Sequence, residues 1–246
     1  MSLQFSDTTN KSGILQVIER KTKLGDGGIT GNPQRLKEFT SEVNLAQDKA
    51  FSVIFKANGL WQFDDSNHTD YPIITTNLVA NQRDYTFTTD EQGNLILDIY
   101  KVMVKDEDGI FHEIYPVDQQ SDEYMDGFWS GQNETGIPSR YDKTANGIFL
   151  DCIPSYNSTN GLKVFINREG SYFTTSDTTK KPGFSGLFHK YLAVVPSYEY
   201  ACTNQLANKN DLKQEMLEIE ADMKKHYRDR SKDESPRITS ETVNSI

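Results

Sequence analysis

The chain has 246 residues, enough for one large domain or two small ones, and a formal net charge of −10. Hydrophobic residues make up 35% of it and aromatic residues 11%, which is too aromatic for an intrinsically disordered chain. Because the chain is strongly acidic, it lacks the general electrostatic footprint of a nucleic-acid-binding protein. An acidic protein could still line a channel through which DNA moves without binding to the channel wall.

The first thirteen residues are predicted to form a polar arm. We expect no signal peptide, because residues 1–13 lack a basic region followed by an apolar one. No apolar run approaches the roughly 18 residues that a membrane span needs. Without a secretory signal, the two cysteines, Cys152 and Cys202, are expected to be free thiols.

Two helices are predicted before residue 60. Residues 14–23 form a short amphipathic helix that the glycine-rich stretch 25–28 ends. A phosphate-cradling loop is the alternative for this stretch, but a plain linker is favoured because no Gly-Lys-Ser/Thr ending is present. Asn32 and Pro33 then begin a long helix, as N-cap and first helical residue, with apolar residues three and four positions apart until Gly59 ends it.

The middle of the chain has strand patterns. Residues 94–106 are the strongest, being long and rich in Ile, Val and Leu, and Asp108-Gly109 turns them into a second strand. Asn146-Gly147 and Asn160-Gly161 are each predicted to be a tight turn before a further strand, because both residue types tolerate positive φ. These turn signals predict antiparallel strands throughout this region.

The chain is predicted to become helical again at residue 183. An aromatic-rich helix runs to residue 207 with a kink at Pro196, and Leu187 is among the residues expected on its buried face. A last helix begins at Asp211 and ends near residue 230. Residues 231–246 have no core-forming pattern and are predicted to be a free or docking tail.

This order of elements predicts an α+β protein in which a helical bundle carries an inserted antiparallel β domain. The long helix and the C-terminal helices can pack together only if the β region is inserted between them in sequence. The predicted parts are the arm and short helix at 1–32, the bundle at 33–59 and 183–230, the β domain at 60–182 and the tail at 231–246.

No catalytic, cofactor or metal site is predicted, and no enzyme activity. The four histidines, at 68, 112, 189 and 226, lack metal-ligand spacing, and no nucleophile elbow occurs. Residues 106–109 resemble the first half of a calcium-binding loop, but a hairpin turn explains them fully. The aspartates at 64, 65 and 70 could hold a cation, but a solvated loop is the more common outcome. Nothing selects a catalytic pair among the 36 acidic residues.

A resemblance to a known family lies between residues 136 and 202. The segment begins Gly-x-Pro-x-x-Tyr, continues with Ile-x-Leu-x-x-x-Pro and Leu-Lys-Val, and reaches Ser-Asp-Thr-Thr-Lys-x-Pro-Gly-Phe before a helix ending Tyr-Glu-Tyr-Ala. In this order and spacing the motifs resemble the head-to-tail adaptor, or connector, proteins of short-tailed bacteriophages, over about a quarter of the chain. The matching positions are Gly136, Pro138, Tyr141, Pro154, Arg168, Asp177, Pro182, Gly183, Phe184, Phe188 and His189.

The resemblance implies a structural virion protein at the head–tail interface, present in the host cytoplasm during assembly. Such adaptors form a ring of about twelve copies by a heterologous cyclic contact. The implied partners are the portal protein, further copies of the chain, and the next tail component, a nozzle or tail fibre. DNA would pass through the ring without specific binding, and no membrane is involved.

The basic end of the last helix and the tail after it are predicted to dock into a groove of the portal, since an unstructured tail can order on binding. Favourable pairing with the helix C-terminal dipole is the simpler explanation of the basic cluster. The residues predicted to dock are Lys224, Lys225, Arg228, Arg230, Ile238 and Ile246.

Two other functions stay open. A carbohydrate- or receptor-binding virion module would present exposed, coplanar aromatics, for which the candidates are Tyr124, Phe128, Trp129 and Tyr156, the first three in the predicted loop 118–135. A hydrolase would need a cleft with convergent carboxylates, for which the sequence offers no support.

Overall fold

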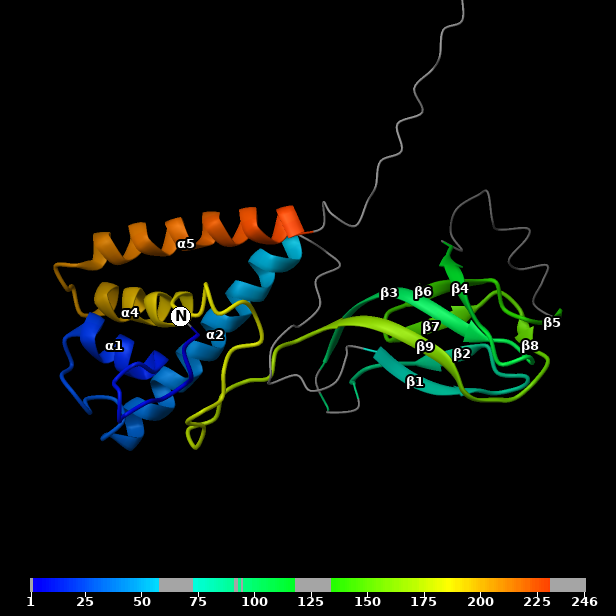
Figure 1. The fold of residues 1–246 in the computed structure, drawn as a ribbon, viewed down its shortest axis with the longest axis horizontal. Coiled ribbons are helices and arrows are strands. Elements are labelled where there is room, and N and C mark those ends of the chain that lie inside the picture. Colours follow the sequence, from blue (N-terminus) through cyan, green and yellow to red (C-terminus); the bar gives the residue numbers. More distant parts are fainter. Residues whose placement is uncertain (1, 58–72, 91–92, 94, 118–133, 231–246) are drawn as a thin grey trace, which may run out of the picture. The chain divides into compact units, whose positions relative to one another are not determined.

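The computed structural model of the protein divides into two compact units (Figure 1). Residues 1–61 and 172–246 form one unit, here called the helical unit, and residues 62–171 form the other, the β unit. The structure describes residues 2–57, 73–90, 93, 95–117 and 134–230. Among the helices described, none combines the length and hydropathy needed to span a membrane.

Four helices are described in the helical unit: α1 (Ile14–Thr22), α2 (Pro33–Ala57), α4 (Tyr191–Thr203) and α5 (Lys209–Arg230). Helix α4 contacts each of the other three, and α2 also contacts α5. Seven consecutive residues of α4, Tyr191 to Ser197, are buried. This all-round burial is what the central position of α4 requires, because a helix enclosed by others has no solvent face.

Helix α2 begins where its sequence signals predict. The side-chain oxygen of Asn32 accepts hydrogen bonds from the backbone N–H groups of Gln34 (3.0 Å) and Arg35 (3.2 Å), and Pro33 is the first helical residue. These bonds satisfy two of the donors that a helix N-terminus leaves free. The apolar stripe predicted from the spacing is buried, including Phe39, Val43, Ala46, Ala50 and Ile54.

Helix α4 begins at Tyr191, later than the predicted start at residue 183. Residues 183–190 instead form turns, with the Phe188 N–H bonded to the Ser185 carbonyl. Glycine and serine are weak helix formers, and Gly183, Ser185 and Gly186 fall within one turn's length of each other. Pro196 lies inside α4, which runs through it to Thr203.

The main sheet of the β unit has seven strands in the order β1-β9-β3-β4-β6-β7-β2. All neighbouring strands are antiparallel except β4 and β6, which pair in parallel through Tyr115–Arg140 and Pro116–Tyr141. The strands are β1 (Ile73–Leu78), β2 (Asp84–Thr86), β3 (Ile96–Lys105), β4 (Phe111–Pro116), β6 (Arg140–Thr144), β7 (Gly147–Leu150) and β9 (Ser158–Arg168). Two short strands, β5 (Thr135–Gly136) and β8 (Ile153–Pro154), pair in parallel apart from this sheet.

The predicted fold class, a helical bundle with an inserted antiparallel β domain, is wrong. The protein has four described helices and a mixed sheet that curls like half a barrel (Figure 1). The error has a physical cause: hairpin signals specify only strands joined by a tight turn, which are antiparallel. The parallel neighbours β4 and β6 are joined by a longer connection, so no local pattern specified them.

Asn160 and Gly161 do not form the predicted turn between strands. Both lie inside β9, where Asn160 has φ +51° and its backbone N–H donates to the side chain of Asn77 on β1 (2.9 Å). The pairing of β1 with β9 shifts register beside this point, between Thr76 and Leu78. The same tolerance of positive φ that suits a turn also suits a bulge, so the dipeptide was ambiguous.

The core of the β unit lies on one face of the curled sheet. Buried aliphatic residues face each other across neighbouring strands, as in the pairs Val102–Val164, Val104–Leu162 and Val102–Ile114. Cross-strand pairs of β-branched residues are the main stabilising contacts of a sheet. The strand predicted at 94–106 therefore lies at the centre of this core.

Candidate functional site

The polar arm predicted at residues 1–13 is bound to the helical unit. Residues 2–13, here called the N-terminal strap, form backbone hydrogen bonds from Phe5 to Lys180 (2.8 Å) and from Ser6 to Thr178 (2.9 Å). Phe5 is fully buried and stacks on Phe173, with 4.6 Å between ring centroids. Phe5 therefore anchors the strap in the core, although residues 8–11 of the strap are exposed.

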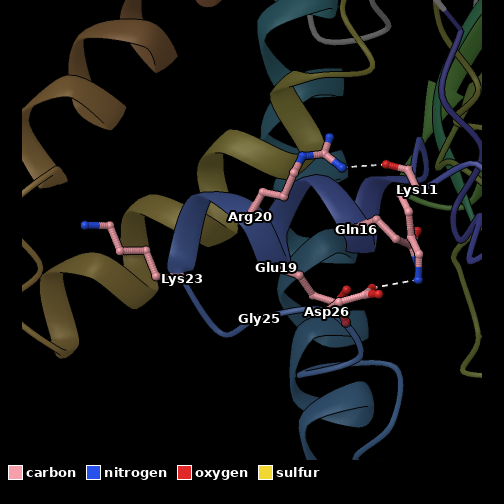
Figure 2. Close-up of a pocket in the computed structure, with 7 residues that line it drawn as sticks. All are labelled: Lys11, Gln16, Glu19, Arg20, Lys23, Gly25 and Asp26. Atoms are coloured by element: carbon pink, nitrogen blue, oxygen red, sulfur yellow. Dashed lines mark hydrogen bonds and ion pairs between the residues drawn. The ribbon is translucent and has the colours of Figure 1, made fainter.

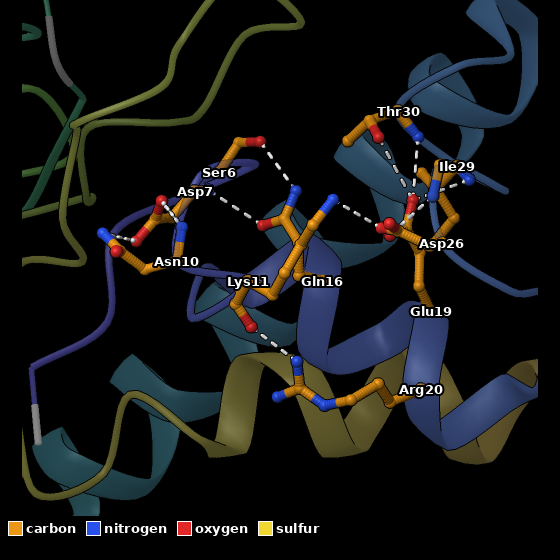
Figure 3. Close-up of polar contacts among 11 residues, drawn as sticks. Ser6, Asp7, Asn10, Lys11, Gln16, Glu19, Arg20, Asp26, Ile29 and Thr30 are labelled. Carbon is orange, nitrogen blue, oxygen red and sulfur yellow. Dashed lines mark hydrogen bonds and ion pairs between the residues drawn. The ribbon is translucent and has the colours of Figure 1, made fainter.

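A polar network fastens the strap to α1 (Figure 3). The buried side chain of Gln16 accepts a hydrogen bond from the Asp7 N–H (2.8 Å) and donates to the Ser6 hydroxyl (3.1 Å). Asp7 in turn accepts from the Ser12 hydroxyl (2.6 Å) and the Asn10 N–H (2.8 Å). These bonds, that from Ser12 first, hold the pKa of Asp7 below its ordinary value.

The glycine-rich stretch after α1 surrounds an internal carboxylate. Glu19 is buried, and its carboxylate accepts hydrogen bonds from the backbone N–H groups of Ile29 (2.9 Å), Thr30 (3.0 Å) and Gly27 (3.3 Å). A phosphate would need these same amides. Because the protein's own anion occupies them, the structure favours a structural loop over a phosphate cradle.

An open hollow of about 370 Å³ lies between the strap and α1 (Figure 2). Two of its three cationic groups are bonded within the hollow: Lys11 forms an ion pair with Asp26 (2.7 Å), and Arg20 donates to the Lys11 carbonyl (2.5 Å). Gln16 and Glu19, which also line it, are bonded within the networks just described. Lys11, Gln16 and Arg20 thus hold the strap in place, and the lining contains no Ser, Thr or Cys nucleophile beside a base.

Chemistry elsewhere in the described residues is equally sparse. No three His, Cys, Asp or Glu side chains among them are grouped to hold a metal ion. Both cysteines are free thiols, as predicted. Burial raises the pKa of Cys152 to about 11, so its sulfur is a poor nucleophile at neutral pH.

In the β unit, the family-motif residues are mainly buried. Pro138 and Tyr141 are buried, Tyr141 within β6, and Gly136 is half-buried in β5. Arg168, the last residue of β9, is only 2% exposed and forms a buried ion pair with Asp90. Removing one partner of an ion pair placed so deeply would leave an uncompensated buried charge.

In the helical unit, the motif residues form the turns before α4. The Asp177 carboxylate accepts a hydrogen bond from the Thr174 N–H (2.7 Å), which closes a tight turn. Pro182, Gly183 and Phe188 are buried, and the ring of Phe188 lies 6.2 Å from that of Tyr227 on α5. These residues therefore join the segment before α4 to its neighbours.

His189 ties this segment to the N-terminal strap. Its Nε2 lies 2.8 Å from the Phe184 carbonyl, which can only accept, so Nε2 carries the proton. In this tautomer Nδ1 accepts a hydrogen bond from the Leu3 N–H (3.1 Å), and the Leu3 carbonyl lies at a similar distance (3.0 Å). Burial lowers the pKa of His189, which keeps the ring neutral and this arrangement intact at neutral pH.

The residues predicted to dock on the portal are only partly within the described chain. Lys224, Lys225 and Arg228 are exposed near the end of α5. The side chain of Arg230, together with Ile238, Ile246 and the rest of residues 231–246, lies outside the described residues.

The aromatic residues of the carbohydrate-binding alternative are also only partly described. The hydroxyl of Tyr156 donates to the Lys105 carbonyl (2.6 Å), and its ring is half-buried against the β core. Tyr124, Phe128 and Trp129 lie outside the described residues. Tyr156 therefore has a structural role in the β unit that explains its presence without a bound sugar.

A second open hollow, of about 470 Å³, was not predicted from the sequence. We call it the basic hollow; its lining combines apolar and cationic side chains from the strap, α1 and the turns before α4. The six residues are Leu3, Val17, Arg20, Lys21, Leu187 and Lys190. No local pattern could have revealed it, because it unites three segments, and because Leu187, expected to be buried, is 69% exposed.

Charge is distributed unequally between the two units. The β unit contains seven Lys or Arg and nineteen Asp or Glu, and the helical unit contains nineteen and seventeen. The formal charges are therefore −12 and +2, so the acidic surplus of the chain belongs entirely to the β unit.

Comparison with known proteins identifies no relative: no protein-family model matches the chain, and no curated protein matches it significantly in sequence.

Proposed function

We propose that the protein is a structural virion protein, a head-to-tail adaptor whose copies form a ring that joins the portal to the tail. The observation that carries the proposal is the ordered set of motifs between residues 136 and 202. Most of the matching residues, including Tyr141, Arg168 and His189, are buried. A resemblance carried by core residues concerns the fold, which supports a structural more than a catalytic role.

The polar groups of the helical unit support the same role. The carboxylates of Asp7 and Glu19 and the cations Lys11 and Arg20 are engaged in bonds that fasten the strap and its loop. A rigid subunit that transmits load between partners needs such internal ties. An enzyme instead leaves a nucleophile, base or acid facing its substrate.

The charge of the β unit suits the passage of DNA. With a formal charge of −12, this unit would repel phosphates electrostatically wherever it borders the passage. DNA would then move through the ring without binding. The partners proposed are the portal on one side and the next tail component, a nozzle or tail fibre, on the other.

Quantitative mass spectrometry of gradient-purified virus particles tests this function. A copy number close to that of the portal supports an adaptor ring. A few copies per particle, or a multiple matching the fibres, favours the receptor-binding alternative. Absence from the particles overturns the proposal.

A further inference from the structure

We propose that the basic hollow of one copy binds the acidic tip of the β3–β4 hairpin of a second copy. The inference rests on the proposed ring, for which it names the contact between neighbouring copies. Its two surfaces are both present in the described residues, and each has an exposed apolar group beside charges that the chain leaves unbalanced.

We call the three cationic residues that line the basic hollow its rim and the three apolar ones its floor. The floor is made by Leu3, Val17 and Leu187, and Leu187 is 69% exposed, the highest value among the exposed large apolar residues described. A single exposed leucine is common on protein surfaces. Three apolar side chains gathered in one hollow are a better binding surface, because covering them removes apolar area from water.

The hollow is held in shape before anything binds. His189 fixes Leu3 of the strap, since its Nδ1 accepts the Leu3 N–H (3.1 Å). The strap also passes close to Gly186, where a Cβ atom would lie only 3.1 Å from the Ser2 side chain. A preformed surface loses less conformational entropy on binding than one that must first become ordered.

The rim of the hollow carries a surplus of positive charge. Lys21 (2.5 Å) and Lys190 both form ion pairs with the same carboxylate, Glu215 on α5. Although burial alone raises the pKa of Glu215, hydrogen bonds from Lys190 and Lys21 lower it overall, so this carboxylate is ionised.

The third cation of the rim, Arg20, donates to a neutral backbone carbonyl, that of Lys11. Among the described residues, Glu215 is thus the one carboxylate paired with this cluster, by Lys21 and Lys190, and together with Arg20 the four side chains have a net charge of +2. The rim can accept two carboxylates of a partner.

The β3–β4 hairpin tip has the complementary features. Ile110 is 58% exposed, and Glu107 and Asp108 beside it are exposed and have no ion pair among the described residues. The tip thus presents one apolar side chain and two negative charges. These match the apolar floor and the net charge of the rim.

The hairpin tip is also rigid. The carboxylate of Asp106 is bonded within the hairpin: it accepts a hydrogen bond from the Ile110 N–H (2.8 Å) and contacts His112 Nε2 (2.6 Å). Its own N–H bonds the Ile110 carbonyl (2.9 Å), and Gly109 supplies the positive φ of +85° that the turn needs. Glu107 and Asp108 are therefore the carboxylates left for a partner.

The contact joins two different patches, so it is heterologous. Each copy that uses its tip still has a free hollow, and each copy that uses its hollow still has a free tip. Repeated head-to-tail contacts of this kind close into a ring when the rotation between copies permits.

The test uses two variants of the full chain. The hollow variant carries Arg20→Glu and Leu187→Glu, and the tip variant carries Glu107→Lys and Asp108→Lys; all four side chains are exposed. The matched control carries Lys37→Glu and Leu45→Glu, which are exposed on α2 and belong to neither patch. Circular dichroism verifies that each variant is folded, and sedimentation velocity over a concentration series measures self-association.

We expect the unmodified chain and the control to self-associate, and each test variant to do so at least about tenfold more weakly, the change that 1.4 kcal/mol produces. A mixture of the two test variants should form a one-to-one dimer, because it retains one intact tip and one intact hollow. A mixture that stays monomeric overturns the inference, as does an unmodified chain that stays monomeric at its highest soluble concentration. Variants that associate as the control does also overturn it.

The association experiment and the mass spectrometry of virus particles can fail independently of each other. If the protein is found in particles at the portal's copy number while the variants associate normally, only this contact is wrong. If association depends on hollow and tip but particles lack the protein, the contact stands and the adaptor function fails.

Discussion

At the scale of single residues, His189 couples the strap to the turns before α4. Its neutral ring accepts from the Leu3 N–H and donates to the Phe184 carbonyl. Protonation would replace the bond from the Leu3 N–H by one from Nδ1–H to the Leu3 carbonyl (3.0 Å), but it would also place a charge on a buried ring, so acid should weaken this region. Burial favours the neutral form of the ring and so lowers the pKa of His189, which makes the stability of the fold depend on pH.

We therefore predict that stability falls as the pH decreases from about 6.5. The pKa of His189 in the folded protein lies below the ordinary histidine value of about 6.5, so the unfolded chain binds the proton first. The free energy of unfolding should decrease below about pH 6.5 until the folded-state pKa is passed. Urea unfolding between pH 8 and 5 measures this slope, and His189→Ala should flatten it; an equally steep slope in the variant would contradict the assignment.

Arg168 provides a second prediction at this scale. Arg168→Ala should lower the free energy of unfolding by about 3–5 kcal/mol, because it leaves Asp90 charged and buried without its partner. The matched control is Lys143→Ala, which removes the exposed ion pair with Asp98 (3.0 Å) and should cost less than about 1 kcal/mol. Equal losses in denaturant unfolding would show that burial of the Arg168 pair is not what matters.

At the scale of elements, Gly147 governs the pairing of β7 with β2. A Cβ atom at this position would lie 2.0 Å from the Tyr85 carbonyl oxygen, a backbone atom that cannot move without disturbing the ladder. Gly147→Ala should therefore destabilise the β unit by roughly 1–3 kcal/mol, as overpacking does.

Gly136 in β5 is the control for this substitution. Nothing lies within 4 Å of a Cβ atom added there, so Gly136→Ala should be nearly neutral. Thermal unfolding of both variants makes the comparison. A neutral Gly147→Ala would mean that β2 does not approach β7 as closely as the structure has it.

The elements also show how far local sequence signals reach. Asn32, Pro33 and the apolar spacing after them predicted α2 correctly, because an N-cap and a helical stripe depend only on near neighbours. Asn146 lies in the turn between β6 and β7 as expected, but Gly147 is already the first residue of β7 and neither residue has the positive φ expected of it. Asn160-Gly161 lies within β9. The dipeptides are identical, so their different outcomes depend on the strands that pair beside them.

At the scale of the whole molecule, the docking role of the C-terminal tail is a prediction that a truncation tests. Deleting residues 231–246 should leave the thermal stability unchanged and weaken attachment to the portal, because Ile238 and Ile246 are lost. Pull-down of the chain by purified portal rings measures attachment. Full binding by the truncated chain would refute the docking role of the tail.

The exposed end of α5 supplies a separate arm of that experiment. Lys224→Glu with Lys225→Glu keeps the tail but reverses the two charges. Weaker portal binding at low salt and little difference at high salt would identify an electrostatic contact, since screening shortens the reach of exposed charges. Unchanged binding would limit docking to the tail itself.

The sequence by itself determined the start of α2, the hairpin at Asp108-Gly109 and the free state of both cysteines. Each depends on a few consecutive residues or on composition. The end of α2 predicted at Gly59 lies outside the described residues. Only the tertiary structure decided the parallel pairing of β4 with β6, the exposure of Leu187 and the burial of Phe5 in the N-terminal strap. Each of these depends on which distant segments meet, and so on packing energies that the spacing of residues along the chain does not contain. The basic hollow is the clearest case, because its six residues come from three segments that fold together around His189 and Glu215.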